Sequence, residues 1–179
     1  KKILFVATKK QAKGLVAEAA EALNMPYITE RWPGGLLTNF ATIRKSIKKM
    51  QIIDKMKENG TFASLSKRER LQIDRQRAKL DLNLGSIVKM TRMPEAVFII
   101  DTNKEHIALA ESNKLGILSF ALNDTNTNPS QVNFPIPAND DATKSIECIL
   151  SIVTKAIAEG LEERNTEQDK KAVQKKEKS

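Results

Sequence analysis

The stretch from Phe40 to Met93 constrains the fold most strongly, because it combines helical periodicity with most of the positive charge. It contains 14 of the 30 lysine and arginine residues but only 5 of the 22 acidic residues. Its net charge of +9 exceeds the +8 of the whole chain, so the rest of the chain is close to neutral in sum. The positive charge is therefore confined to one segment.

The first half of this stretch predicts a helix, since its apolar residues recur at steps of three and four positions. These residues are Phe40, Ile43, Ile47, Met50, Ile53 and Met56. Thr38 or Asn39 is expected to cap its start through a side-chain oxygen. Gly60 is expected to end it, because glycine adopts a positive φ at little cost.

The second half predicts another helix. Ser66, followed three residues later by Glu69, matches a capping box, and Ile73, Leu80 and Ile87 then repeat at heptad spacing. Two such helices joined by a short polar turn are expected to pack antiparallel as a coiled-coil hairpin. An arm of about 19 residues reaches about 28 Å at ~1.5 Å per residue, so the hairpin should project from a compact body.

The flanking regions predict an α/β body. Lys2–Thr8 and Glu95–Asp101 are continuous apolar runs, which are typical of buried parallel strands. Three more strands are expected over Pro26–Glu30, over Ile117–Leu122 and, at an edge because of its prolines, over Phe134–Pro137. Helices are expected over Gln11–Leu23, over Lys104–Leu115 and from a cap at Asn139–Asp141 to Leu161. The order predicts a doubly wound parallel sheet flanked by helices.

These elements divide the chain into three parts. Residues 1–39 and 94–161 form the α/β domain, and residues 40–93 form the inserted hairpin. Residues 162–179 are almost all polar and lack apolar periodicity, so we expect a disordered tail. Between the body and the hairpin, Trp32, Pro33, Gly34 and Gly35 are expected to form a hinge, with Trp32 packed under the base of the hairpin.

The amino-acid composition limits the classes of partner that the chain could bind. A pI near 9.6 favours a polyanionic partner, and the hairpin lacks the aromatic face that membrane insertion needs. Aromatic residues make up only 4% of the chain, too few for a base-stacking platform. No apolar run is long enough to span a membrane and no signal peptide is recognised, and the single cysteine, Cys148, suits a reducing cytoplasm. The spacing of Cys148 from Ile149, Ile152 and Val153 suggests a buried thiol.

The ends of the predicted strands offer no catalytic set, so no enzyme activity, metal or cofactor is predicted. The turn at Thr8–Gln11 lacks the glycines of a dinucleotide or phosphate loop. Asp101 and Glu105 suit either a hard cation or helix capping, and capping is the favoured role. His106 is the only histidine, which excludes a closed zinc site built from histidine and cysteine.

The excess of lysine and arginine residues predicts that the hairpin binds folded RNA through its phosphates. Recognition of backbone shape is expected, since side chains cannot read the deep major groove of an RNA helix. The residues selected for phosphate contact are Lys9, Lys10, Arg31, Arg44, Lys48, Lys49, Arg68, Arg70, Arg75, Arg77 and Arg92. Two alternatives stay open. One is a doubly wound enzyme acting on a phosphorylated small molecule or nucleotide, and the other is a module whose coiled coil docks a partner helix, although few spare apolar positions are expected for it.

Several motifs occur in an order that resembles one known family. They are Lys2–Ala12, Arg31–Asn39, Phe98–Asp101 with Glu105–Ala108, Asp124–Asn126 and Asn139–Ala142. Together they resemble the bacterial small-subunit ribosomal protein S2 family, from Lys1 to about Leu161. Pro33 stands where many members carry leucine, and Asn128 stands where an acid is common. The family's N-terminal segment, with its Gly-Val-His-Phe-Gly-His-like stretch, has no counterpart in this sequence.

This resemblance implies a flavodoxin-like sheet with a protruding coiled coil and a non-enzymatic role in the cytoplasm. It implies binding to small-subunit ribosomal RNA near the junction of head and body, among neighbouring ribosomal proteins. It further implies recruitment of the large OB-repeat protein of the small subunit that handles messenger RNA. Neither a membrane nor a small-molecule substrate is expected as a partner.

Overall fold

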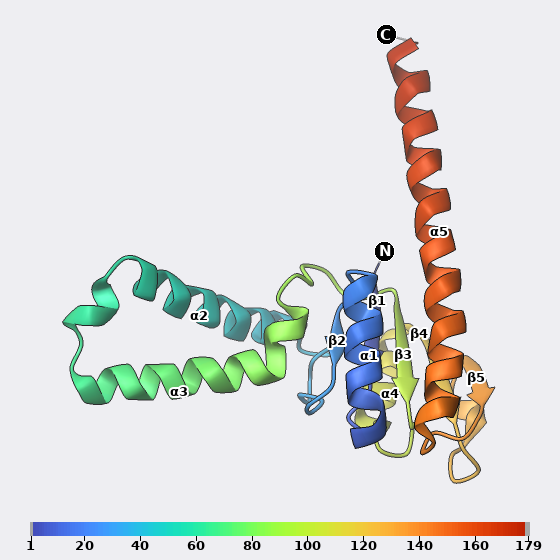
Figure 1. Cartoon of the computed structure of the whole chain (residues 1–179), viewed down its shortest axis with the longest axis horizontal. Coiled ribbons are helices and arrows are strands. Elements are labelled where there is room, and N and C mark those ends of the chain that lie inside the picture. The colour runs from blue at the N-terminus through green and yellow to red at the C-terminus, as the bar shows by residue number, and fades with distance from the viewer. Residues whose placement is uncertain (1, 178–179) are drawn as a thin grey trace.

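The computed structural model describes residues 2–177, and side chains up to residue 164 and at Thr166 (Figure 1). Its body is a five-stranded sheet in the order β2-β1-β3-β4-β5, and all neighbouring strands are parallel. The strands are β1 (Ile3–Val6), β2 (Tyr27–Ile28), β3 (Ala96–Ile100), β4 (Leu118–Asn123) and β5 (Phe134–Pro137). Parallel pairing buries both faces of the sheet, which explains the continuous apolar runs in β1 and β3.

Helices cover both faces of this sheet. α1 (Lys10–Ala22) and α5 (Thr143–Glu177) pack on one face, and α4 (His106–Leu115) and the base of the hairpin pack on the other. Successive strand residues alternate between the two layers, so Leu4 joins the α4 side while Phe5 joins the α1 side. The doubly wound α/β prediction is confirmed.

The segment between β2 and β3 forms two helices that project from the body, α2 (Phe40–Glu58) and α3 (Lys67–Leu84). Figure 1 shows them side by side and antiparallel, joined by a turn that includes the 3-10 helix Thr61–Ser64. Gly60 adopts φ +74° at this turn. A coiled-coil packing of the pair stays a prediction.

The ends of the two helices are stabilised differently. Ser66 and Glu69 form the predicted capping box, because the Ser66 amide donates to Glu69 and the Glu69 amide donates to the Ser66 hydroxyl. At the start of α2, Asn39 holds the cap position but its side chain accepts no amide hydrogen bond. Its Oδ1 instead accepts from the Thr42 hydroxyl at 2.8 Å, so the cap position was predicted correctly and its interaction was not.

Strand β5 closes one edge of the sheet, as its prolines predicted. The Ala138 amide, just beyond β5, donates to the carbonyl of Asn123 in β4 at 3.1 Å. Amides of alternate strand residues point to opposite sides, so Phe134 and Ile136 also face β4. Pro135 and Pro137 therefore occupy the two outward positions of β5, where no N–H donor is present.

Two further predictions differ from the structure. Helix α5 continues to Glu177, where a disordered tail was expected over residues 162–179, and Figure 1 shows it extending past the body. The last two residues of that prediction lie outside the described part of the chain. The added residues are rich in Glu, Lys and Gln, which are good helix formers but provide no apolar stripe. Cys148 is exposed, where a buried thiol was expected. Ile146 and Leu150 lie on the buried face of α5, and a residue between them points away.

A membrane-spanning helix would need a long apolar stretch, and no helix within residues 2–177 has one.

Candidate nucleic-acid interface

A buried carboxylate fixes the loop from which the hairpin emerges. Glu111 of α4 is 8% exposed and accepts from the Trp32 indole at 3.0 Å and from the Gly35 amide at 2.7 Å. It also accepts from the amides of Leu37 at 2.9 Å and Thr38 at 3.0 Å. Burial opposes ionisation of Glu111, but the donated N–H groups outweigh it and hold its pKa below the ordinary value.

This arrangement gives the loop residues a defined role. Trp32 is 6% exposed and lies in the core under the hairpin base, as predicted. Gly35 adopts φ +82°, a conformation that favours glycine, and a Cβ there would meet the Cβ of Asn39 at 3.3 Å. The hydrogen bonds to Glu111 hold the loop in one geometry, and a hinge motion about Trp32, Pro33, Gly34 and Gly35 stays a prediction.

Arg44 joins the two ends of the hairpin rather than projecting from it. Its guanidinium donates to the carbonyl of Met90 at 3.2 Å and approaches that of Val88 at 3.5 Å. Both carbonyls follow α3, so Arg44 links the start of α2 to the chain that returns to the body. This half-buried position gives Arg44 a structural role, and the phosphate contact expected of it stays a prediction.

The outer face of α2 carries exposed lysines. Ile47, Met50 and Ile53 are buried on the inner face of this helix. Residues at positions 45, 48, 49 and 55 lie on the opposite side of the helical wheel, because each residue adds 100°. All four are exposed lysines, namely Lys45, Lys48, Lys49 and Lys55. No carboxylate among the described residues pairs with them.

Helix α3 separates its arginines between two faces. Arg68, Arg75 and Lys79 are exposed on the outer face and form no ion pair within residues 2–177. Arg70 and Arg77 are half-buried on the side toward α2.

Arg77 is held by two carboxylates of its own chain. It donates to Asp54 of α2 at 2.9 Å and to Asp81 at 2.9 Å, and the hydrogen bond to Asp54 raises the pKa of Arg77 above its ordinary value. Arg77 thus ties the two helices together, and a phosphate contact by this residue stays a prediction.

Lys9 is also bound within its own chain. Its ammonium lies 2.6 Å from Asp140, 2.7 Å from Asp141 and 3.2 Å from Asp101. Burial alone would lower the pKa of Lys9, but hydrogen bonds to Asp140, Asp141 and Asp101 raise it above its ordinary value. These three ion pairs engage the ammonium of Lys9 within its own chain, and a phosphate contact by Lys9 stays a prediction. Lys10 is exposed at the start of α1, across the sheet from the hairpin.

The two remaining basic residues expected to contact phosphate, Arg31 and Arg92, lie near the foot of the hairpin, where it joins the body. Arg31 lines a hollow of about 510 Å³ together with Lys79 and Asn83 of α3. The structure thus brings an exposed base of the body beside the projecting arm. Arg92 is exposed in the segment that returns from α3 to β3. Neither arginine pairs with a carboxylate in the part of the chain that the structure describes.

Sequence reasoning missed some residues of this surface. Lys45, Lys55, Lys79 and Lys89 are exposed bases that were not selected. A helical-wheel argument based on the apolar stripe would have found Lys45 and Lys55 and separated Arg75 from Arg77. Glu111 carried no signal, because the sequence does not show that a carboxylate on α4 meets five donors from a loop more than 70 positions earlier.

The crevice where doubly wound sheets bind ligands is filled by the chain itself. Strands β1 and β3 are neighbours, but the chain leads from β1 to β2 on one side of the pair and from β3 to β4 on the other. Doubly wound sheets usually bind ligands at the carboxyl ends of two such strands. There Glu105 accepts from the amide of Thr8 at 3.1 Å and from its hydroxyl, and Lys104 donates to the carbonyl of Thr8 at 3.1 Å. Asp101 accepts from the amides of Asn103 and Lys104 at 3.1 Å in the turn before α4. Glu105 holds the cap position of α4 but makes no side-chain cap hydrogen bond, so the predicted helix capping is not found. These contacts leave no support for a nucleotide site.

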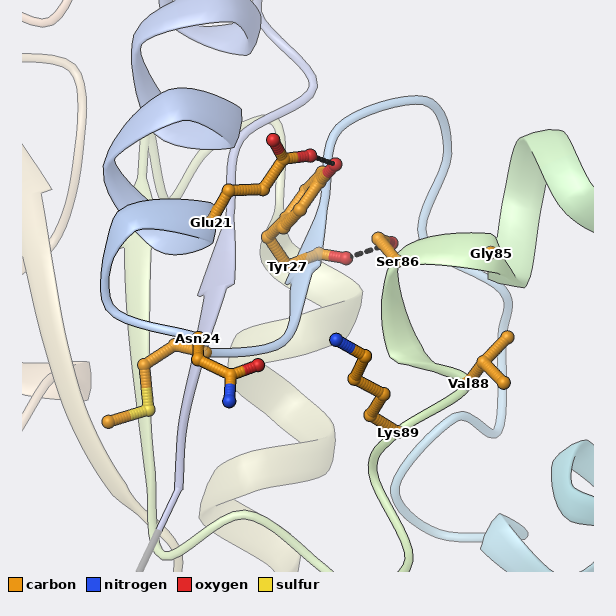
Figure 2. Close-up of a pocket in the computed structure, with 8 residues that line it drawn as sticks. Glu21, Asn24, Tyr27, Gly85, Ser86, Val88 and Lys89 are labelled. Carbon is orange, nitrogen blue, oxygen red and sulfur yellow. Dashed lines mark hydrogen bonds between the residues drawn. The ribbon is translucent and has the colours of Figure 1, made fainter.

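A second hollow, of about 440 Å³, lies between the end of α1, strand β2 and the segment after α3. Figure 2 shows Tyr27 donating to Glu21, Ser86 directed at the carbonyl of Tyr27, and Lys89 reaching between them and Asn24. Ser86 faces a carbonyl and no base, so the hollow holds no activated nucleophile among the described residues.

Known proteins match this chain over nearly its whole length. A model described as Ribosomal protein S2 matches residues 1–160. The small ribosomal subunit protein uS2 of Flavobacterium johnsoniae is 62% identical over 174 residues, covering 97% of this chain and 68% of the relative. That of Phocaeicola vulgatus is 65% identical over 167 residues, covering 93% and 60%. That of Christiangramia forsetii is 64% identical over 167 residues, covering 93% and 56%.

The chain thus spans 60% or less of the length of two of these relatives and 68% of the third. The matched residues include all five strands, both hairpin helices and the packed part of α5. The relatives are named as ribosomal proteins, not as enzymes, in agreement with the closed crevice. The resemblance found from the ordered motifs is confirmed, and the chain belongs to the ribosomal protein S2 family.

Proposed function

We propose that this chain is a structural constituent of the small ribosomal subunit and binds ribosomal RNA through the outer faces of its hairpin. The observation that carries the proposal is the set of exposed bases on α2 and α3 that find no carboxylate within the described residues. They are Lys45, Lys48, Lys49, Lys55, Lys67, Arg68, Arg75 and Lys79. Phosphate oxygens supply the missing counter-charge.

The geometry favours recognition of backbone shape. An α-helix with side chains is about 10–12 Å across, so two helices side by side make an arm roughly 20 Å wide. Its cations lie on both outer faces, which suits an arm that sits between two RNA segments. Because side chains cannot enter the deep major groove of an RNA helix, the contacts are to phosphates and ribose.

The body supplies further contacts and partners. Arg31 and Arg92, near the hairpin base, extend the same cationic surface, and Lys10 offers a separate base on the α1 side. The family resemblance supports a place at the junction of head and body, in the cytoplasm, beside other small-subunit proteins. It also supports recruitment of the OB-repeat messenger-RNA-binding protein, with no membrane or small-molecule partner.

Docking of a partner helix is a weaker proposal, although the arm exposes more apolar surface than its sequence predicted. Ile52, Leu71 and Leu82 are 57%, 52% and 65% exposed. They are separate residues among lysines and arginines rather than a continuous stripe, and single exposed apolar residues are ordinary. The other alternative, an enzyme that acts on a phosphorylated small molecule or nucleotide, gains no support from the crevice, because side chains of the protein fill it.

Charge reversal tests the RNA proposal. Replacing Lys48, Lys49, Arg68 and Arg75 by glutamate is expected to abolish binding to small-subunit ribosomal RNA while the circular dichroism of the fold is kept. Wild-type affinity should fall with salt by roughly 0.7–0.9 log units per phosphate per decade. A charge-matched variant with four reversals to glutamate outside the hairpin, at the exposed residues Lys114, Lys144, Lys155 and Arg164, lowers the net charge equally and should bind normally. Unchanged RNA binding by the hairpin variant would contradict the proposal.

A further inference from the structure

We propose that Asp124, Asp140 and Asp141 form a binding site for a hard divalent cation of the Mg²⁺, Mn²⁺ or Ca²⁺ class. Each offers a carboxylate oxygen, and these oxygens lie within 4.8 Å of one another. Oxygens that share one such ion at ~2.1–2.5 Å are separated by at most about twice that distance. Three carboxylates without histidine or cysteine are a ligand set for hard cations and not for zinc.

The fold brings these residues together at the carboxyl edge of the sheet. Asp124 directly follows β4, and the loop with Asp140 and Asp141 leads from β5 into α5. The backbone hydrogen bond from Ala138 to Asn123 joins the two segments immediately before the carboxylates. Asn139 accepts from the amides of Asp141 and Ala142, at 2.8 and 3.0 Å, which fixes the loop.

One oxygen in this cluster lacks a partner although it is buried. Asp140 is 1% exposed, and its Oδ1 accepts from Lys9 at 2.6 Å. Its Oδ2 is buried and has no hydrogen-bond partner within residues 2–177. A buried carboxylate oxygen without a donor is costly, and native structures rarely leave one so. A cation beside Asp140 would satisfy this oxygen.

The net negative charge of the carboxylate cluster also favours a divalent cation as its ligand. Lys9 contributes one positive charge, and it is shared among Asp101, Asp140 and Asp141. Asp124 adds a fourth carboxylate, so a negative excess remains after Lys9 has been counted. A divalent ion offsets most of that excess. A pocket of about 450 Å³ lined by Asp124, Thr127 and Pro137 opens at this corner, which gives an ion and its water access from solvent.

Binding of Mn²⁺ to the metal-free chain tests the site, with electron paramagnetic resonance as the readout and Mg²⁺ and Ca²⁺ as competitors. The wild-type chain is expected to bind one Mn²⁺ and to release it to Mg²⁺ or Ca²⁺. Asp124→Asn and Asp141→Asn should each weaken binding by roughly tenfold or more, since each removes one ligand charge. Glu18→Gln, an equal charge change on the exposed side of α1, should bind as the wild type does.

The two variants were chosen because Asp141 is exposed and Asp124 is only half-buried, so the fold should survive either change. Their thermal unfolding without metal checks this. Added Mn²⁺ should raise the melting temperatures of the wild type and Glu18→Gln, and should raise those of the two aspartate variants less at the same concentration. Absence of saturable Mn²⁺ binding by the wild type, or equal binding by all four proteins, would overturn the proposal. The measurement uses no RNA, so it can fail while the proposed RNA binding holds, and the reverse.

Discussion

Glu111 accepts a hydrogen bond from the indole of Trp32 at 3.0 Å, although 79 positions of sequence separate the two residues. The bond links α4, on one face of the sheet, to the loop from which the hairpin starts. Since the same carboxylate accepts from the amides of Gly35, Leu37 and Thr38, one side chain ties the loop at the base of the projecting arm to the body.

Replacement of this carboxylate is therefore expected to destabilise the fold. Glu111→Gln puts an amide N–H where the carboxylate accepted hydrogen bonds, which leaves buried donors unpaired. We expect a loss of about 3 kcal/mol in the free energy of unfolding, measured by urea denaturation. Glu18→Gln on the exposed side of α1 is the control and should change stability by less than about 0.5 kcal/mol.

The same contact predicts a dependence on pH. The pKa of Glu111 is lowered in the folded state, mainly by the amide of Thr38 and the indole of Trp32 acting against burial. Its contribution to stability is complete above the unfolded pKa of about 4.3 and is lost as the pH falls through the folded pKa. The stability difference between wild type and Glu111→Gln should thus shrink below about pH 4. A difference that is constant from neutral to acid pH would show that the charge of Glu111 is unimportant.

Two arginines of α3 offer a matched test of the interface. Arg75→Gln removes an exposed, unpaired cation, so it should lower RNA affinity and reduce the salt slope by roughly 0.7–0.9 without changing stability. Arg77→Gln breaks the contacts to Asp54 and Asp81, so it should lower the melting temperature and leave the salt slope nearly unchanged. Filter binding over a salt series and thermal denaturation separate the two effects. Equal salt slopes for both variants would argue against the assignment of faces.

Adjacent glycines at the hairpin base should respond differently to alanine. Gly35→Ala forces a side chain into φ +82° and against Asn39, at a cost of about 1–2 kcal/mol. An added Cβ at Gly34 meets nothing within 4 Å and needs no positive φ, so Gly34→Ala should be neutral or slightly stabilising. Equilibrium unfolding of both variants is the measurement. A larger loss at Gly34 than at Gly35 is the result that this geometry forbids.

The only tyrosine gives a spectroscopic check on the end of α1. The hydrogen bond from Tyr27 to Glu21 raises the pKa of Tyr27 to about 12. The phenolate absorbance of the wild type should therefore rise at higher pH than that of Glu21→Gln, whose midpoint should return toward about 10. Stability from this contact is complete below about pH 10 and is lost as the pH rises through the folded pKa. Identical titration curves would rule the contact out.

Local patterns predicted the elements of the fold well, because burial on a parallel sheet and on a helix face leaves a direct periodicity in the sequence. The continuous apolar run of β3, the prolines of β5 and the capping box at Ser66 each indicated the element found there. Strand and helix ends moved by one or two residues, since terminal residues have weaker periodicity. The end of α5 was misjudged because charged residues with high helix propensity carry no apolar stripe.

The interface was harder to predict because charge alone does not reveal which side of a helix a base occupies. Arg75 and Arg77 are two positions apart and chemically identical, yet only Arg77 faces Asp54 across the hairpin. Lys9 was assigned to phosphate although its partners, Asp140 and Asp141, follow more than 130 positions later. Such long-range pairings depend on topology, which one sequence shows only indirectly.

The two outward prolines of β5 have a consequence for crowded conditions. A strand from another molecule that approaches this border finds carbonyl oxygens at residues 135 and 137 but no amide to complete a ladder. Copies of the chain therefore cannot prolong one another's sheets at that end, and high concentrations should not by this route yield fibrils.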